Sequence, residues 1–226
     1  MSGVYLAGGS KGGVGKSLVS MALLDYLEQS GETPVLVETD QSNSDVAKAY
    51  PHLPSLTVDL NVADGWIDLV NALEEQADAP VVINSAAGSL PGIIEYGGGL
   101  KEAAKELGRR LVIVWPINRG RDSIEAAKLV HDRMPGVPFY ILRNLYFSPA
   151  SKFEFFNATN LRKALEEAGS GKGGVLDFPD LADRVADAFY TDRKSIQAAR
   201  EGMPLGNRVE LDRWRAEVRK VIERLV

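Results

Sequence analysis

A lysine and a serine end a glycine-rich stretch near the N-terminus, and their order and spacing suit phosphate binding. Lys16 and Ser17 follow the apolar run Val4–Ala7 and a turn in which glycine recurs. Glycine lacks a Cβ, so backbone N–H groups can converge on phosphate oxygens, and a following helix points its positive dipole end at the same anion. Lys16 would reach the β and γ phosphates of a nucleotide, and the Ser17 hydroxyl would bind Mg²⁺. The pattern predicts a strand, a phosphate loop and a helix; a glycine-rich turn with two solvated lysines is the alternative.

The loop departs from the usual GxxxxGK[ST] spacing in one informative way. Ser10 stands where that pattern has glycine, and a second lysine, Lys11, lies near the start of the loop. The run KGGVGKS resembles the deviant Walker A motif of the ParA/MinD family of ATPases. In that family the early lysine crosses to the nucleotide of the partner subunit, a role that the resemblance assigns to Lys11. The residues of this loop expected to contact ATP or ADP are Gly12, Gly13, Val14, Gly15, Lys16, Ser17 and Leu18.

Length and composition limit the class of protein. The chain has 226 residues, 45% of them hydrophobic, which is enough for a sizeable core and fits one α/β domain over residues 1–226. We expect a P-loop NTPase fold, with a mostly parallel twisted sheet and helices on both faces. Cysteine is absent and only two histidines are present, which excludes disulfides and disfavours a zinc site. With no charged-then-apolar leader and no long apolar run, a cytoplasmic protein is expected.

Carboxylates follow the apolar run at residues 35–37. Glu38 and Asp40 would lie at the carboxyl end of a parallel strand, beside the phosphate loop, where open α/β sheets bind ligands. By resemblance, Asp40 matches the carboxylate that handles the attacking water, and we expect it near Mg²⁺. A turn or helix-cap role for Asp40 is the alternative. Glu38 is open between supporting the metal and a structural role.

The apolar run at 81–83 leads into a second polar strand end. Asn84 stands where family members usually carry an aspartate that helps to hold Mg²⁺ and its waters. An amide brings no negative charge, so the change puts hydrolysis in doubt more than nucleotide binding. The glycine-rich stretch 88–99 is expected to be a mobile apolar loop that responds to the γ-phosphate or meets a partner, or else an ordinary surface loop with a short helix.

Later residues are candidates for contact with the base. An asparagine at the place of Asn144 reads the adenine edge in the family, and an amide offers both the donor and the acceptor that adenine needs. The family also places a proline-containing loop against the base, which makes Pro179 and Asp180 candidates. Turn formation is the alternative for Asn144. For Arg119 and Arg121, three environments are open: phosphate, a partner chain or solvent. For the aromatic residues within 146–156, two roles are open: packing across the end of the sheet or forming a recognition face.

Hydrophobic periodicity places the other elements. It predicts helices near 15–29, 66–73, 101–107, 123–132 and 161–168, and strands near 56–62, 111–116, 139–142 and 175–179. The stretch 195–204 resembles a helix of the ParA/MinD family that ends in Gly-x-Pro, and the resemblance implies a helix there.

The C-terminal region is basic on an acidic chain. The net charge is −5, yet residues 193–226 carry nine Lys and Arg against five Asp and Glu. An amphipathic helix is expected within 208–226, with Leu211, Trp214 and Val218 on one stripe. The favoured interpretation is that this helix packs against the rest of the protein. The second is sequence-independent DNA binding by its arginine-rich outer face. The interleaved acidic residues disfavour a helix that lies on a membrane surface.

The resemblance implies a homodimer formed with ATP, slow hydrolysis and a protein partner that stimulates hydrolysis or is positioned. Lys11, Lys16 and Asp40 would be the catalytic residues, with Ser17 and Asp40 at the metal. The stretch VETDQSN, the missing aspartate at Asn84 and the residues 144–146 are similar to TraL-type proteins of plasmid conjugal transfer and mobilisation. A nucleotide-gated scaffold with little or no turnover is the alternative.

Overall fold

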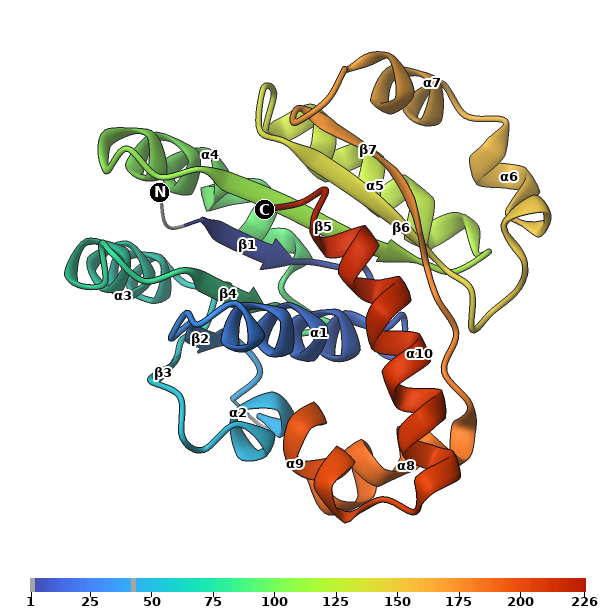
Figure 1. The fold of residues 1–226 in the computed structure, drawn as a ribbon. Helices are drawn as coiled ribbons and strands as arrows, with labels where there is room; N and C mark the ends of the chain where they lie inside the picture. Colours follow the sequence, from blue (N-terminus) through green and yellow to red (C-terminus); the bar gives the residue numbers. More distant parts are fainter. Residues whose placement is uncertain (1–2, 42–43) are drawn as a thin grey trace.

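A seven-stranded sheet forms the centre of the molecule. The computed structural model describes residues 3–41 and 44–226, and every strand pairing in it is parallel. The strands lie in the order β3-β2-β4-β1-β5-β6-β7 (Figure 1). Their bounds are β1 Val4–Ala7, β2 Val35–Glu38, β3 Ser55–Thr57, β4 Val81–Asn84, β5 Leu111–Ile117, β6 Phe139–Asn144 and β7 Gly173–Phe178.

Helices cover both faces of this sheet (Figure 1). The helices are α1 Lys16–Gln29, α2 Asp45–Ala49, α3 Ala63–Glu75, α4 Leu90–Glu106, α5 Arg121–Arg133, α6 Glu154–Asn157, α7 Asn160–Glu167, α8 Asp183–Asp192, α9 Ile196–Gly202 and α10 Leu205–Ile222, with a 3₁₀ turn at Ala150–Lys152. One core joins the sheet to α1, α2, α8, α9 and α10, and the other joins it to α3 to α7. The predicted α/β architecture is confirmed.

The alternation of side chains along β1 shows why central strands are apolar throughout. Tyr5 and Ala7 enter the core beneath α1, whereas Val4 and Leu6 enter the core on the opposite face. A strand with helices on both faces has no wet side, so a continuous apolar run is favoured over an alternating one. The register pairs Ala7 with Asn84, and Asn84 with Glu38, which gathers the polar strand ends at one edge.

Two segments differ from the sequence predictions. The strand expected over 56–62 ends at Thr57, because Asp59 starts a turn in which its Oδ1 accepts from Asn61 N at 2.9 Å. The glycine-rich stretch 88–99 was expected to be a loop, but it forms most of α4. Buried residues recur there at helical spacing (Ile93, Gly97, Leu100 and Ala104), and this packing outweighs the low helix propensity of glycine.

The C-terminal helix begins earlier than expected, at Leu205 in place of residue 208. Its apolar stripe is buried as predicted, with Leu211, Trp214 and Val218 all in the core beneath α1. Helix α8, which lies between β7 and α9, was not predicted from the sequence. No helix among the described residues is both long enough and apolar enough to cross a membrane.

Candidate functional site

The turn after β1 has the backbone geometry of an anion site. Gly13 and Gly15 adopt positive φ angles of 77° and 106°, a region that residues with a Cβ rarely enter. A Cβ on Gly15 would lie 2.6 Å from Asn144 Nδ2, so this position is closed to a side chain in two ways. A Cβ on Gly12 or Gly13 would meet nothing within 4 Å, which leaves the rim of the turn open.

Helix α1 begins at this turn without a side chain over its N-terminus. Its N-cap is Gly15, no side chain caps it, and its first turn carries no acidic residue. The N–H groups of the first turn therefore face the loop with the positive end of the helix dipole. Within the described chain, the Ser10 hydroxyl oxygen is buried with no hydrogen-bond partner. These features fit a bound phosphate.

Lys16 is held inside the loop. Its side chain is buried, and Nζ donates a 2.8 Å hydrogen bond to the carbonyl of Lys11. Burial lowers the pKa of Lys16, and the nearby charge of Asp40 acts in the opposite direction. A desolvated ammonium gains more from an approaching anion than a solvated one does, because less hydration has to be lost. Ser17, the next residue, is in the first turn of α1.

Lys11 has a different environment from Lys16. Its ammonium is exposed and forms an ion pair with Asp122, the second residue of α5. This contact lowers the pKa of Asp122 through the hydrogen bond and the charge of Lys11. The two lysines of the loop are thus separated, with one directed into the phosphate turn and the other across its mouth to α5.

The polar ends of β2 and β4 form a buried network. Asn84 Nδ2 donates to Glu38 Oε2 at 2.8 Å, and Asn84 Oδ1 accepts from Ser20 Oγ of α1 at 3.0 Å. Glu38 Oε1 accepts from Ala47 N at 3.1 Å, which ties α2 to the sheet. Burial raises the pKa of Glu38, while the bond from Asn84 lowers it. Both side chains therefore form hydrogen bonds within the protein. From the sequence alone, Glu38 was open between supporting a metal and a structural role.

The residues that follow these two strands are also linked. Thr39 Oγ1 lies 3.1 Å from Ser89 Oγ and accepts from Ala86 N at 2.7 Å. Ser89 is the N-cap of α4, so the bond joins the end of β2 to the beginning of that helix. Asp40 comes next along the chain, close enough to Lys16 for its charge to affect the lysine. Ser42 and Asn43, the last two residues of the stretch VETDQSN, lie outside the described residues.

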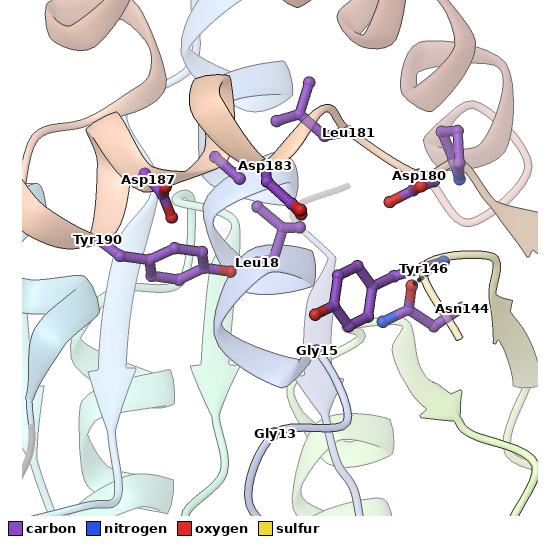
Figure 2. A pocket seen from close by; sticks show the side chains of 12 residues that line it. Gly13, Gly15, Leu18, Asn144, Tyr146, Asp180, Leu181, Asp183, Asp187 and Tyr190 are labelled. Atoms are coloured by element: carbon purple, nitrogen blue, oxygen red, sulfur yellow. Dashed lines mark hydrogen bonds between the residues drawn. The ribbon is translucent and has the colours of Figure 1, made fainter. Parts of the chain in front are cut away.

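A pocket of about 190 Å³ opens on the other side of Gly15. The predicted residues Asn144, Pro179 and Asp180 line it together with Gly13, Gly15 and Leu18. Figure 2 shows this arrangement, with Asn144 and Tyr146 beside the glycine turn and Asp180 across from them. The remaining predicted loop residues, Gly12, Val14, Lys16 and Ser17, are not part of its lining.

Asn144 connects this pocket to the glycine-rich turn after β1. Its Nδ2 donates to the Val14 carbonyl at 3.1 Å, and its Oδ1 accepts from Tyr146 N at 3.1 Å. An amide has two N–H donors and two acceptor lone pairs, so one donor and one acceptor position are left for a ligand. The loop that carries Pro179 is fixed from behind, because Trp214 Nε1 of α10 donates to the Pro179 carbonyl at 3.0 Å.

Helix α8 supplies the wall that the sequence analysis missed. Asp183 and Tyr190 extend from α8 toward Leu18 and Gly15 in Figure 2, and Asp187 lies between them on the same helix. A signal was present in the apolar spacing of Leu181, Val185 and Phe189, which recurs every four residues. Carboxylates here offer acceptors to the hydroxyl and amino groups of a ligand, whereas the loop offers N–H donors to phosphate.

The other candidate residues lie away from this pocket. Arg121 stacks over the Phe155 ring at 4.8 Å, and Phe153 and Phe156 are buried in the core under α5 to α7. In the basic tail, Arg200 pairs with Asp212 at 2.7 Å and Arg215 pairs with Asp25 at 2.7 Å. Part of the tail's positive charge is therefore neutralised by the protein itself. Within the described residues, no cluster of three His, Cys, Asp or Glu side chains suits a metal ion.

Comparisons with known proteins agree with this architecture. No model of a known protein family matches the sequence. The chain is 48% identical to Protein MobD of Acidithiobacillus ferrooxidans over 224 residues, which is 99% of this chain and 97% of that protein. It is 24% identical to Protein TraL of Escherichia coli over 207 residues, covering 85% and 83% of the two chains.

Solved structures of cell division proteins share the fold. MinD of Aquifex aeolicus superposes with a TM-score of 0.59 and 12% identity, over 98% of this chain and 97% of that one. The cell division ATPase MinD of Pyrococcus furiosus gives a TM-score of 0.51 and 13% identity over the full length of both chains. The predicted resemblance to the ParA/MinD group and to TraL is confirmed. The chain therefore belongs to the same family as Protein MobD and has the P-loop fold of the MinD ATPases.

Proposed function

We propose that this protein binds Mg-ATP at the carboxyl ends of its central strands, dimerises around the nucleotide and hydrolyses it slowly. The carrying observation is the opposite polarity of the two halves of the site. Lys16 and the uncapped N-terminus of α1 present positive charge at one end, and Asn144 and Asp180 present acceptors at the other. A nucleotide has the matching polarity, with an anionic phosphate chain and a base and sugar that donate hydrogen bonds. We propose that residues 1–226 act as one ATPase domain.

The phosphate end follows from the loop geometry. Lys16 would leave the Lys11 carbonyl for the β and γ phosphates, and the Gly12, Gly13 and Gly15 N–H groups would bind the same oxygens. The Ser17 hydroxyl is the proposed ligand of Mg²⁺, and Asp40 would lie near the ion. The Mg²⁺ ion would neutralise negative charge on the phosphates. Asp40 would orient the attacking water. Lys11 would leave Asp122 to reach the nucleotide bound by a second copy, so that dimerisation completes each site.

The base end follows from the pocket beside Asn144. Its free N–H and lone pair suit the adenine edge, and the backbone around Pro179 and Asp180 would lie against the ring. Leu18 contributes an apolar contact below the sugar, and Asp183 and Asp187 offer acceptors to its hydroxyl groups.

The biological setting that we propose is DNA transfer or mobilisation, which rests on the similarity to TraL and MobD. A protein partner would stimulate hydrolysis or be positioned by the switch, in the cytoplasm. Arginines of the C-terminal region that lack an acidic neighbour would supply any sequence-independent contact to DNA. Partition of plasmids or chromosomes by the same kind of switch is the broader version of this role.

The test is ATP turnover with Mg²⁺ measured together with molar mass by light scattering. We expect slow turnover in the wild type, loss of nucleotide binding in Lys16→Ala, and an ATP-bound dimer without turnover in Asp40→Ala. Lys11→Ala is the matched variant, because it removes the other lysine of the loop and should retain ATP binding while losing the dimer. If Lys16→Ala binds ATP as the wild type does, the proposed site is wrong.

A nucleotide-gated scaffold is the second candidate, and one observation favours it. The Asn84 amide brings no negative charge to the site, and its amide group is already engaged on both sides, as donor to Glu38 and as acceptor from Ser20. Under this function the wild type would bind ATP and dimerise with no phosphate release. The same turnover measurement separates the two functions.

A further inference from the structure

An apolar groove runs between α3 and α4, and it shares no lining residue with the pocket beside Asn144. Its volume is about 440 Å³, and its walls are mainly apolar side chains on successive turns of the two helices. The helices pack side by side at the left of Figure 1. The residues that matter here are Trp66, Ile67 and Val70 of α3 and Tyr96, Gly99 and Ala103 of α4.

The walls of this groove are firmly built. Trp66 Nε1 donates to the Leu60 carbonyl at 2.6 Å, and the rings of Trp66 and Tyr96 lie 6.0 Å apart. On α4, a Cβ on Gly92 would lie 1.6 Å from the same Leu60 carbonyl. Helix α4 therefore packs directly against the loop that precedes α3. The groove is therefore a fixed feature of the α3 and α4 packing.

Two features of the groove suit an incoming side chain. Ile67 is 56% exposed although it is a large aliphatic residue, which costs hydrophobic free energy as long as it stays uncovered. A Cβ on Gly99 would meet nothing within 4 Å, so the backbone of α4 is accessible at this point of the wall. A partner side chain can approach the α4 backbone there more closely than any larger residue would allow.

The charge around the groove decides what can cover it. Helix α3 carries four acidic side chains and no basic one, and α4 carries three acidic side chains against two lysines. One of those lysines, Lys101, pairs with Glu102 at 3.6 Å. Symmetric pairing of two copies of this face would bring two acidic rims together, and anionic lipid or nucleic acid would be repelled by the same charge.

We propose that this groove is the docking site for an amphipathic helix of a protein partner, with an apolar stripe flanked by Lys and Arg. The stripe would place side chains at i, i+3 or i+4 and i+7 over Ile67, Gly99 and the Trp66 and Tyr96 rings. The basic flanks would lie against the carboxylates of α3 and the Glu95 side of α4. The proposal does not rest on the proposed ATP site, because no groove residue belongs to that site.

The test uses two synthetic 18-residue helical peptides with the same leucine stripe, one flanked by lysines and the other by glutamates. We expect saturable binding of the lysine peptide to the full chain, weakened by salt, and no binding of the glutamate peptide. Ile67→Asp should weaken binding about tenfold or more, because it removes a covered aliphatic side chain. Val209→Asp, on α10, is the matched control: Val209 is also exposed, at 61%, and its loss should leave binding unchanged.

The tryptophan indole N–H signals in an NMR spectrum locate the peptide. The chain has three tryptophans, and only Trp66 lines the groove, so its signal should shift while those of Trp115 and Trp214 stay in place. Absence of saturable binding, an unchanged affinity in Ile67→Asp, or shifts at the other two indoles would overturn the proposal. A change of sedimentation in Ile67→Asp without peptide would also overturn it, since a second copy would then be the occupant.

Discussion

The amide of Asn84 donates its 2.8 Å hydrogen bond to Glu38 across the paired ends of β4 and β2, with the carboxylate as acceptor. An aspartate at position 84 would set a second carboxylate against a buried one and remove this donor. The asparagine therefore suits the glutamate beside it.

The pH dependence of stability should follow from this pair. Burial raises the pKa of Glu38 above its usual 4.5, so the folded state binds more protons than the unfolded state in this range. Stability therefore falls as pH rises from the usual value through the raised one. Asn84→Ala removes a hydrogen bond that lowers the pKa of Glu38, so the pKa should rise further and the pH range over which stability falls should widen. The variant should lose about 1 to 3 kcal/mol in the free energy of unfolding at neutral pH. Urea unfolding across the pH range measures the effect.

The control for this experiment is Asn84→Ala combined with Glu38→Gln. The double variant lacks the titrating carboxyl, so the extra pH dependence should disappear. An equal loss of stability for Asn84→Ala at about pH 5 and about pH 8 would contradict the prediction, because a cost unrelated to ionisation would then dominate.

Gly15 should tolerate no side chain. Gly15→Ala would place a Cβ 2.6 Å from Asn144 Nδ2 on a backbone with φ of 106°, and we expect a loss of about 1 to 3 kcal/mol in stability. Gly12→Ala is the matched change in the same loop, at a position where a Cβ meets nothing within 4 Å. Chemical unfolding of both variants measures the difference. Equal stability of the two would show that the Asn144 side chain moves aside at no cost.

Trp214 should matter to stability through its hydrogen bond as well as its size. Trp214→Phe leaves the Pro179 carbonyl without its donor, whereas Trp115→Phe deletes a buried Nε1 that has no hydrogen-bond partner in the described structure. Both tryptophans are fully buried, and both changes remove the same ring atoms. We expect Trp214→Phe to cost about 1 kcal/mol more in the free energy of unfolding. A larger loss of unfolding free energy for Trp115→Phe than for Trp214→Phe would contradict a stabilising role for the Trp214 hydrogen bond.

The ion pair between α1 and α10 should be costly to break. Asp25 and Arg215 lie 2.7 Å apart with side-chain exposures of 7% and 13%, and burial raises the pKa of Asp25 despite its arginine partner. Asp25→Ala would leave a buried guanidinium unpaired, at a cost of about 3 to 5 kcal/mol. Asp212→Ala breaks the more exposed pair with Arg200 and should cost about 1 kcal/mol or less. Thermal unfolding separates the two, and similar losses would contradict the role of burial.

The sequence was sufficient for those parts of the molecule that local chemistry determines. The phosphate turn, the helix at Lys16 and the apolar strands follow from glycine spacing and continuous apolar runs. The resemblance to the ParA/MinD family named Asn144, Pro179 and Asp180 as contacts of one base, and the three residues line the same pocket.

The rest depended on tertiary packing. The glycines of α4 indicated a loop, and only the burial of Ile93 and Leu100 shows why the segment is helical. The apolar spacing of Leu181, Val185 and Phe189 indicates a helix, but the place of that helix beside the pocket required the tertiary structure, since neither Asp183 nor Tyr190 belongs to a motif. The pairing of Glu38 with Asn84 required the strand order, because the two residues are 46 positions apart in the chain.

The contact between Thr39 and Ser89 has a thermodynamic consequence. Ser89 begins α4, and α4 forms one wall of the groove lined by Ile67 and Gly99. A shift of Thr39 that carries Ser89 with it would therefore change the groove as well as the strand edge. If a molecule bound in the groove favours one position of α4, it also changes the affinity of the strand edge for its own ligand. The coupling free energy is the same in both directions, so that ligand changes the affinity of the groove by the same factor.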